Sequence, residues 1–190
     1  MSNFSTLFFP VSTVITNIDR LNPSYASILM TISTSTDLFN TTNSVLYRVP
    51  WNLIEWQTNG AVISGSVVND NIVINQTGIY RVAVRYASYD MFSGNNTLTV
   101  RVWFSNSGII GAGAGTILTT IGDGWTGTTA NGLSQKHGEY VFRVLTVPFW
   151  MNVTFLHTGA TGGGGNAGFP VFNNNDGTQP FWYVERLGNL

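Results

Sequence analysis

Alternation of apolar and polar residues is the sequence feature that most restricts the fold. In "TGIYRVAVRYASY", residues 77–89, an extended chain places Tyr80, Val82 and Val84 on one face and Arg81 on the other, because successive side chains of a strand point to opposite faces. The same period of two recurs in residues 44–51, 71–76, 97–104, 139–147, 149–157 and 181–187. These segments are rich in β-branched and aromatic residues, as is typical of strands.

The connections between these segments indicate the fold class. Gly, Asn, Asp and Pro cluster between them, where turns require such residues, and no segment has the period of a long amphipathic helix. Short, regularly spaced strands separated by turns are typical of two packed antiparallel sheets. We therefore predict an all-β fold, a two-sheet antiparallel sandwich of the jelly-roll kind.

The N-terminal part of the chain fits this pattern less well. Residues 25–34 are compatible with a strand, but the segment "TISTSTDLFNTTNS" that overlaps and follows them is rich in Ser, Thr and Asn and cannot bury much surface alone. We predict that residues 1–44 form an extension or arm that orders against a neighbouring protein. Residues 45–190 are then one jelly-roll domain, which is an ordinary size for an all-β domain.

The low charge of the chain restricts its partners. Charged residues make up 9% of the sequence, against about 25% in ordinary soluble proteins, so Asn, Thr, Ser and Gly supply most of the polar surface. Such a surface suits a protein packed among other subunits. The net charge is −1 and Lys136 is the sole lysine, so no basic tail is present to neutralise phosphates. We expect no direct nucleic-acid binding and no binding to anionic membranes.

Membrane insertion and secretion signals are not evident. No stretch reaches the ~18 unbroken apolar residues of a membrane span, and the N-terminal apolar patch has no preceding positive charge and is interrupted by Pro10. Glycosylation sequons of the Asn-x-Ser/Thr type occur at Asn3, Asn40, Asn75, Asn95 and Asn152. In a chain this rich in Asn and Thr, chance occurrence explains these sequons better than glycosylation does.

The candidate catalytic and ligand-binding motifs of the sequence are incomplete. The absence of cysteine excludes thiolate catalysis and sulfur-bound zinc. The glycines of residues 111–116 do not complete a dinucleotide motif, because the third glycine is replaced by Thr116. His137 and Glu139 could share a strand face, but a metal site needs a third ligand. We expect no enzymatic activity and no cofactor.

Two glycine-rich segments, residues 108–138 and 158–179, are predicted to be long surface connections. One interpretation is that they only link strands. The other is that they form a contact surface at one end of the sandwich, with Trp125, Phe169 and Phe172 as aromatic anchors.

The order of several motifs resembles a known superfamily. The turn and strand "TNGAVISG", the segment "NIVINQTGIYRVAVRYASY" with Gly78 and Tyr80, the later "LTVPFWMNVTF" and the closing "FWYVERLG" are together similar to the jelly rolls of tumour necrosis factor and complement-type globular heads, in the versions common among viral and phage particle proteins. The resemblance covers about residues 45–190.

This resemblance implies a ten-strand, two-sheet jelly roll that assembles as a homotrimer around a three-fold axis. It also implies that Tyr80 packs in the core and that the closing aromatic strand lies in the inner sheet near the axis. The acidic cluster of calcium-binding members is absent, and residues 1–44 have no counterpart. Receptor signalling is therefore not part of what we expect.

The arginines of the predicted strands have two interpretations. In one, their long stems cover apolar sheet surface and keep the charged heads in water; in the other, they pair with carboxylates in a contact surface. The chain has seven arginines and one lysine, and lysine would serve equally well if long side chains only covered apolar surface. A planar guanidinium can instead hold a carboxylate, namely Glu185, Glu139 or Asp90, by two hydrogen bonds across strands or subunits. The candidate interface residues are Arg81, Arg85, Arg143, Phe181, Tyr183 and Glu185.

Together these features predict a non-enzymatic structural protein of a virus or phage particle, such as a minor capsid, vertex or spike and attachment component. It would be located in the virion, and its partners would be its own copies, other particle proteins through residues 1–44, and a host glycan or receptor. The alternative is an extracellular carbohydrate-binding module whose exposed Trp and Tyr stack on sugars. A glycosidase would need two carboxylates to converge from nine scattered acidic residues.

Overall fold

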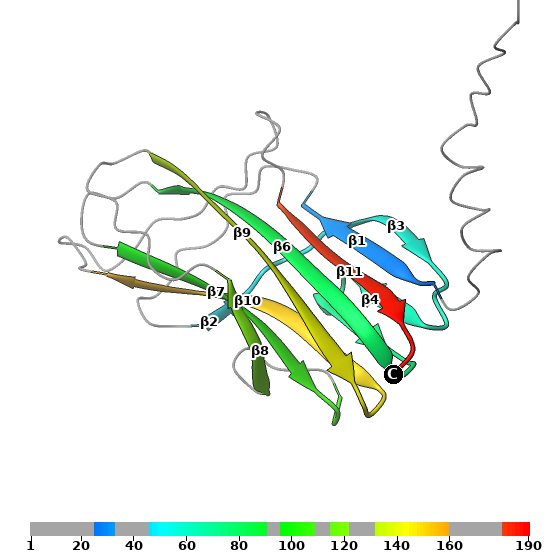
Figure 1. Ribbon diagram of the computed structural model, residues 1–190. Coiled ribbons are helices and arrows are strands. Elements are labelled where there is room, and N and C mark those ends of the chain that lie inside the picture. Colours follow the sequence, from blue (N-terminus) through cyan, green and yellow to red (C-terminus); the bar gives the residue numbers. More distant parts are fainter. Residues whose placement is uncertain (1–24, 33–45, 91–95, 109–114, 122–131, 160–179) are drawn as a thin grey trace, which may run out of the picture.

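The structure is a computed structural model that describes residues 25–32, 46–90, 96–108, 115–121, 132–159 and 180–190. These residues form eleven strands and no helix (Figure 1). The strands are β1 (Ser27–Thr31), β2 (Leu46–Arg48), β3 (Leu53–Thr58), β4 (Ile63–Ser66), β5 (Asn71–Ile74), β6 (Gly78–Asp90), β7 (Asn96–Ser105), β8 (Thr116–Ile121), β9 (Gly132–Val144), β10 (Phe149–Gly159) and β11 (Phe181–Gly188).

The strands form two sheets packed face to face (Figure 1). The first sheet has the order β3-β1-β11-β6-β9, and the second has the order β4-β5-β10-β7-β8 with β2 also paired to β10. Every strand pair is antiparallel. The predicted all-β fold of two antiparallel sheets is confirmed, and each of the seven alternating segments contains or overlaps a strand.

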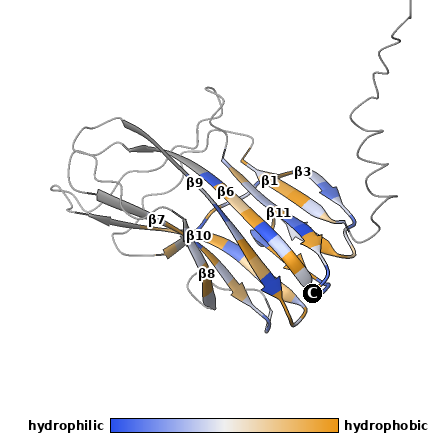
Figure 2. Ribbon diagram, viewed as in Figure 1, coloured by the Kyte–Doolittle hydropathy of each residue, from blue (hydrophilic) through white to orange (hydrophobic). Residues whose placement is uncertain are grey.

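One apolar core fills the space between the sheets. Tyr80, Val82 and Val84 of β6 are fully buried in it, which confirms the predicted faces of this strand, and Figure 2 shows the alternation of apolar and polar residues along β6. The Tyr80 hydroxyl donates a hydrogen bond to the carbonyl of Gln76 at 2.6 Å, so this buried polar group is satisfied. The second sheet contributes mainly Ile72, Ile74, Val100, Val102, Met151, Val153 and Phe155.

Residues 25–32 belong to the sandwich, so the predicted domain boundary at residue 45 is wrong. β1 lies between β3 and β11 and pairs with both. Ala26, Ile28, Met30 and Ile32 alternate along it and are almost completely buried, so this segment belongs to the core and not to an arm. The rest of the predicted 1–44 extension lies outside the described residues.

The predicted connection at residues 108–138 is also partly wrong. Two strands occupy parts of it, since β8 spans Thr116–Ile121 and β9 begins at Gly132. Glycine-rich composition concealed β8, although "TILTTI" is rich in β-branched residues. β9 pairs with β6 over thirteen residues, from Gly132 opposite Asp90 to Val144 opposite Gly78.

The turn between β4 and β5 ends at Asp70, which has a positive φ of 49°. Partial burial raises the pKa of the Asp70 carboxyl from 3.8 to about 6, while Arg48 and a hydrogen bond with the Trp51 backbone act in the opposite direction. The folded state therefore binds this proton more tightly than the unfolded state does. As the pH falls from about 6 to 3.8, protonation of Asp70 in the folded state increases the free energy of unfolding. Above pH 6 the folded state carries a poorly solvated charge at Asp70.

We predict that Asp70→Asn raises the melting temperature at about pH 7.5 and has little effect near pH 3.5, where the parent carboxyl is already protonated. Asparagine tolerates the positive φ of this position, so the turn keeps its backbone geometry. Thermal unfolding of both proteins at the two pH values measures the difference. An equal change at both values would contradict the proposed cost of the charge.

The start of β6 lies unusually close to the end of β11. A Cβ atom added at Gly78 would lie 2.7 Å from the carbonyl oxygen of Gly188 and 2.9 Å from Nε of Arg186. We predict that Gly78→Ala lowers the free energy of unfolding by about 1–3 kcal/mol, as overpacking usually does, measured by urea unfolding. Gly188→Ala is the matched control, because no atom lies within 4 Å of a Cβ there. Equal free energies of unfolding for Gly78→Ala and Gly188→Ala would refute the close approach of Gly78 to Arg186 and Gly188.

Candidate functional site

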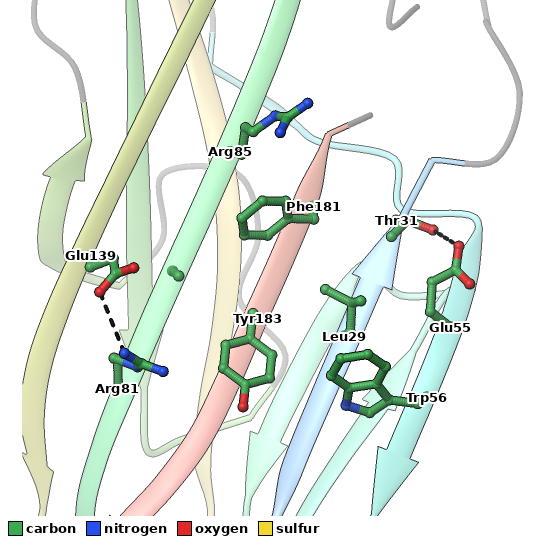
Figure 3. A pocket seen from close by; sticks show the side chains of 10 residues that line it. Leu29, Thr31, Glu55, Trp56, Arg81, Arg85, Glu139, Phe181 and Tyr183 are labelled. Atoms are coloured by element: carbon green, nitrogen blue, oxygen red, sulfur yellow. Dashed lines mark hydrogen bonds and ion pairs between the residues drawn. The ribbon is translucent and has the colours of Figure 1, made fainter. Parts of the chain in front are cut away.

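The outer face of the first sheet, which faces away from the core, carries a groove of about 670 Å³ (Figure 3). All five strands of the sheet contribute to it. Its lining residues are Leu29, Thr31, Glu55, Trp56, Arg81, Ala83, Arg85, Glu139, Phe181 and Tyr183. We call this surface the sheet groove.

The floor of the sheet groove is apolar because strand register aligns four side chains across it. Ala83 of β6 lies opposite Tyr183 of β11, which lies opposite Leu29 of β1, which in turn lies opposite Trp56 of β3. The rings of Trp56 and Tyr183 meet edge to face, with their centroids 6.2 Å apart. Trp56 is 49% exposed, so a large apolar side chain stands open to solvent at one end of this row.

A bulge places Trp56 on the outer face. Met30 of β1 pairs with Ile54 of β3, whereas the preceding Leu29 pairs with Trp56, so Glu55 is the additional residue of β3. Ile54 packs against the core while Trp56, two residues later, faces the groove. A regular strand would put both on the same face, which is why the alternation alone did not identify this part of the site. Bulges often redirect side chains in this way.

Arg81 joins three strands through carboxylates. Its guanidinium forms an ion pair with Glu185 of β11, and its Nη1 lies 3.7 Å from Oε2 of Glu139 on β9. The Tyr183 hydroxyl donates a hydrogen bond to Oε2 of Glu185 at 2.6 Å. The Glu185 side chain is only 11% exposed, so these contacts satisfy a nearly buried charge. The predicted pairing of strand arginines with carboxylates is confirmed for Arg81.

The protonation of this cluster follows from the same contacts. Desolvation lowers the pKa of Arg81, but the carboxylates of Glu185 and Glu139 outweigh it and raise this pKa overall. Burial, together with the hydrogen bond to Glu185, raises the pKa of Tyr183. Tyr183 therefore remains a neutral hydroxyl that can donate, and Arg81 remains a cation.

Arg85 and Phe181 form the other end of the groove. The guanidinium carbon of Arg85 lies 6.0 Å from the centroid of the Phe181 ring, within the range of a cation–π contact. The His137 ring lies 5.9 Å from the same ring. Figure 3 shows Arg85 and Phe181 on neighbouring strands, on the side of the groove far from Trp56.

The structure brings together most of the predicted interface residues. Arg81, Arg85, Phe181 and Tyr183 line the groove, and Glu185 is bound to Arg81 beside it. Arg143 is exposed on β9 opposite Ile79, and it is not part of the groove lining. The sequence did not single out Leu29, Thr31, Glu55 and Trp56. That the predicted residues around the groove form an interface with another chain stays a prediction.

Several other sequence predictions concern residues away from the groove. The loop candidates Trp125, Phe169 and Phe172 lie outside the described residues. Nε2 of His137 lies 3.8 Å from Oε1 of Glu139, but the described part of the chain holds no group of three residues suited to a metal ion. Among the described residues no helix could cross a membrane.

Two sequon asparagines fall within the described residues. Asn152 is almost completely buried on β10, and Asn75 is exposed after β5. A buried asparagine cannot carry a glycan in the folded protein, so Asn152 is unsuited to glycosylation, whereas Asn75 is accessible.

Comparisons with known proteins relate the chain to others by fold. No protein-family model and no curated protein sequence matches it. The crystal structure of murine APRIL at pH 5.0 is similar with a TM-score of 0.55 and 14% identity, over 86% of this chain and 100% of that one. The structure of Eiger TNF from S. frugiperda is similar with a TM-score of 0.54 and 12% identity, over 87% of this chain and 94% of that one. The fold is a jelly roll of the tumour necrosis factor type.

We predict that Arg81→Ala lowers the free energy of unfolding by about 1–2 kcal/mol, between the values for exposed and buried ion pairs. The nearly buried carboxylate of Glu185 would lose its cation, while Arg81 itself is partly exposed and screened. Urea unfolding measures the loss. The control is Arg143→Ala, an exposed arginine of the same sheet, which should change stability by no more than about 0.5 kcal/mol. Equal free energies of unfolding for Arg81→Ala and Arg143→Ala would show that the ion pairs around Arg81 contribute nothing to stability.

Proposed function

We propose that this protein is a non-enzymatic jelly-roll subunit that assembles into a homotrimer through the sheet groove and serves as a structural or attachment component of a virus or phage particle. The observation that carries the proposal is the groove itself. The exposed ring of Trp56, the half-buried rings of Phe181 and Tyr183, and paired charges lie on the outer face of a sheet whose inner face is the core.

The composition of the groove supports self-association. Protein interfaces are enriched in Trp, Tyr, Phe and Arg around an apolar centre, and the groove combines Trp56, Tyr183 and Phe181 with Arg81 and Arg85. An open aromatic row is costly in water for a monomer. The resemblance to tumour necrosis factor jelly rolls implies that copies meet around a three-fold axis, with the closing strand near that axis.

The rest of the chain supports a place in a particle. Only 9% of the residues are charged, which suits a subunit surrounded by other subunits. The residues given are close to neutral, with a net charge of −1, so they offer little charge to neutralise phosphates. The part of the predicted 1–44 arm that lies outside the described residues is proposed to contact other particle proteins. We propose the virion as its location.

A second candidate function is carbohydrate binding in the same groove. The observation that favours it is the half-exposed ring of Trp56, set edge to face against Tyr183 beside the carboxylate of Glu55. An exposed ring beside a polar group can stack on a sugar and hydrogen bond to its hydroxyls. Assembly through the groove would cover this ring, so the two functions compete for one surface.

We predict that the purified protein has three times its chain mass of 20.7 kDa in size-exclusion chromatography with light scattering at micromolar concentration. Trp56→Ala should weaken the trimer by removing its most exposed aromatic contact, with unchanged circular dichroism showing that the fold persists. A monomer at this concentration would overturn the proposed assembly. Binding of the monomer to a glycan array, lost in Trp56→Ala, would instead support the carbohydrate-binding alternative.

A further inference from the structure

The bulge of β3 presents two consecutive side chains on one face of the sheet. In a regular strand Glu55 and Trp56 would point to opposite faces, but both line the sheet groove, because the pairing of β3 with β1 shifts between Leu29 and Met30. Bulges are frequent beside functional sites, where they redirect side chains. A carboxylate and an exposed indole ring therefore lie together at one end of the groove (Figure 3).

Neighbouring strands hold both of these side chains in position. The hydroxyl of Thr31 donates a hydrogen bond to Oε1 of Glu55 at 3.0 Å. The ring of Trp56 meets that of Tyr183 edge to face, at an interplanar angle of 80°, and the Tyr183 hydroxyl is itself held by Glu185. We call Glu55, Trp56 and Tyr183 the aromatic corner. Because its side chains are ordered before a ligand arrives, binding there has a lower entropic cost.

The aromatic corner carries a negative charge that lacks a cation. Among the described side chains, Glu55 is the one charged lining residue that β3, β1 and β11 contribute to the groove. None of the ion pairs within the described ranges involves it. Thr31 donates one hydrogen bond to the carboxylate, and an ionised carboxylate can accept several more. The corner is therefore suited to a ligand that brings a positive charge and hydrogen-bond donors.

The indole ring narrows the choice of cation. Trp56 is 49% exposed, and the face of a tryptophan ring attracts cations more strongly than that of tyrosine or phenylalanine. A planar guanidinium can stack on such a face while its edge donates two hydrogen bonds to a carboxylate, whereas an ammonium is a strongly hydrated point charge. The apolar side chain of Leu29 lies between the two rings in register, where it can contact an alkyl stem.

We propose that the aromatic corner binds the guanidinium group of an exposed arginine of a partner protein, stacked on Trp56 and hydrogen bonded to Glu55. The site depends on the residues of the groove alone, so it does not require the proposed self-association. A second copy seated on the groove would cover Trp56, which means that the partner and the second copy exclude each other.

Thermophoresis of the protein with small arginine analogues tests the site directly. N-acetyl-arginine amide should bind with a dissociation constant on the order of 1 mM, as expected for so small a ligand. N-acetyl-citrulline amide has the same shape without the charge and should bind at least about tenfold more weakly. The same arginine within a short glycine–serine peptide should bind within about threefold of the amide. A peptide that does not bind would overturn the assignment of the ligand to a partner protein.

Variants of the corner separate its two contacts. Glu55→Gln keeps an acceptor for Thr31 and removes the charge, so it should raise the dissociation constant of the arginine amide at least about tenfold. Trp56→Leu should raise it at least about threefold, and Trp56→Phe by less, because a ring is retained. Asp70→Asn is the matched control, since it makes the same carboxylate-to-amide change outside the groove lining. It should alter binding by less than about twofold at 0.15 M salt.

The titration is made on protein diluted until light scattering shows single copies, so that its outcome is distinct from that of the proposed assembly. A monomeric parent that binds the arginine amide would overturn the proposed trimer and support the site. Absence of saturable binding to the parent, whether monomeric or assembled, would overturn the site alone. Equal weakening by Asp70→Asn and Glu55→Gln would also overturn it, as would binding of a neutral methyl glucoside in place of the amide, which would favour the carbohydrate alternative.

Discussion

The structure depends on the alternation of β6, because this one strand builds both the core and the groove. Its inner side chains Tyr80, Val82 and Val84 are fully buried, and burial of each contributes roughly 1.5–3 kcal/mol. Arg81 and Arg85 must then lie on the outer face, where they line the groove. Since β6 pairs with β11 on one side and β9 on the other, the same strand also brings Glu185 and Glu139 to Arg81.

The choice of arginine and tyrosine around Glu185 follows from its burial. A carboxylate with an 11% exposed side chain needs donors for its oxygens. Arg81 supplies a permanent cation and Tyr183 supplies a neutral hydroxyl at 2.6 Å. The cluster is thus satisfied before any partner arrives. In the proposed assembly, a second copy would cover the apolar surface of the groove at little further cost in desolvating Glu185.

Features with a local signature could be predicted from the sequence. The alternation in residues 77–89 predicted the faces of β6, and the excess of arginine over lysine predicted the pairing seen at Arg81. The sequence favours an arm for residues 25–32 because the polar run that follows them obscures their four buried apolar residues. The groove position of Trp56 depends on a bulge opposite Leu29 and Met30, and no pattern within β3 alone indicates where a bulge occurs.

The central claim is that the outer face of the first sheet is covered by another copy of the chain. Hydroxyl-radical footprinting over a dilution series tests it by reading the exposure of individual side chains. Oxidation of Trp56, Phe181 and Tyr183 should fall as assembly proceeds, while oxidation of Tyr140, which stacks on Phe142 outside the groove, should stay constant. Equal oxidation of Trp56 in dilute and assembled protein would contradict the account.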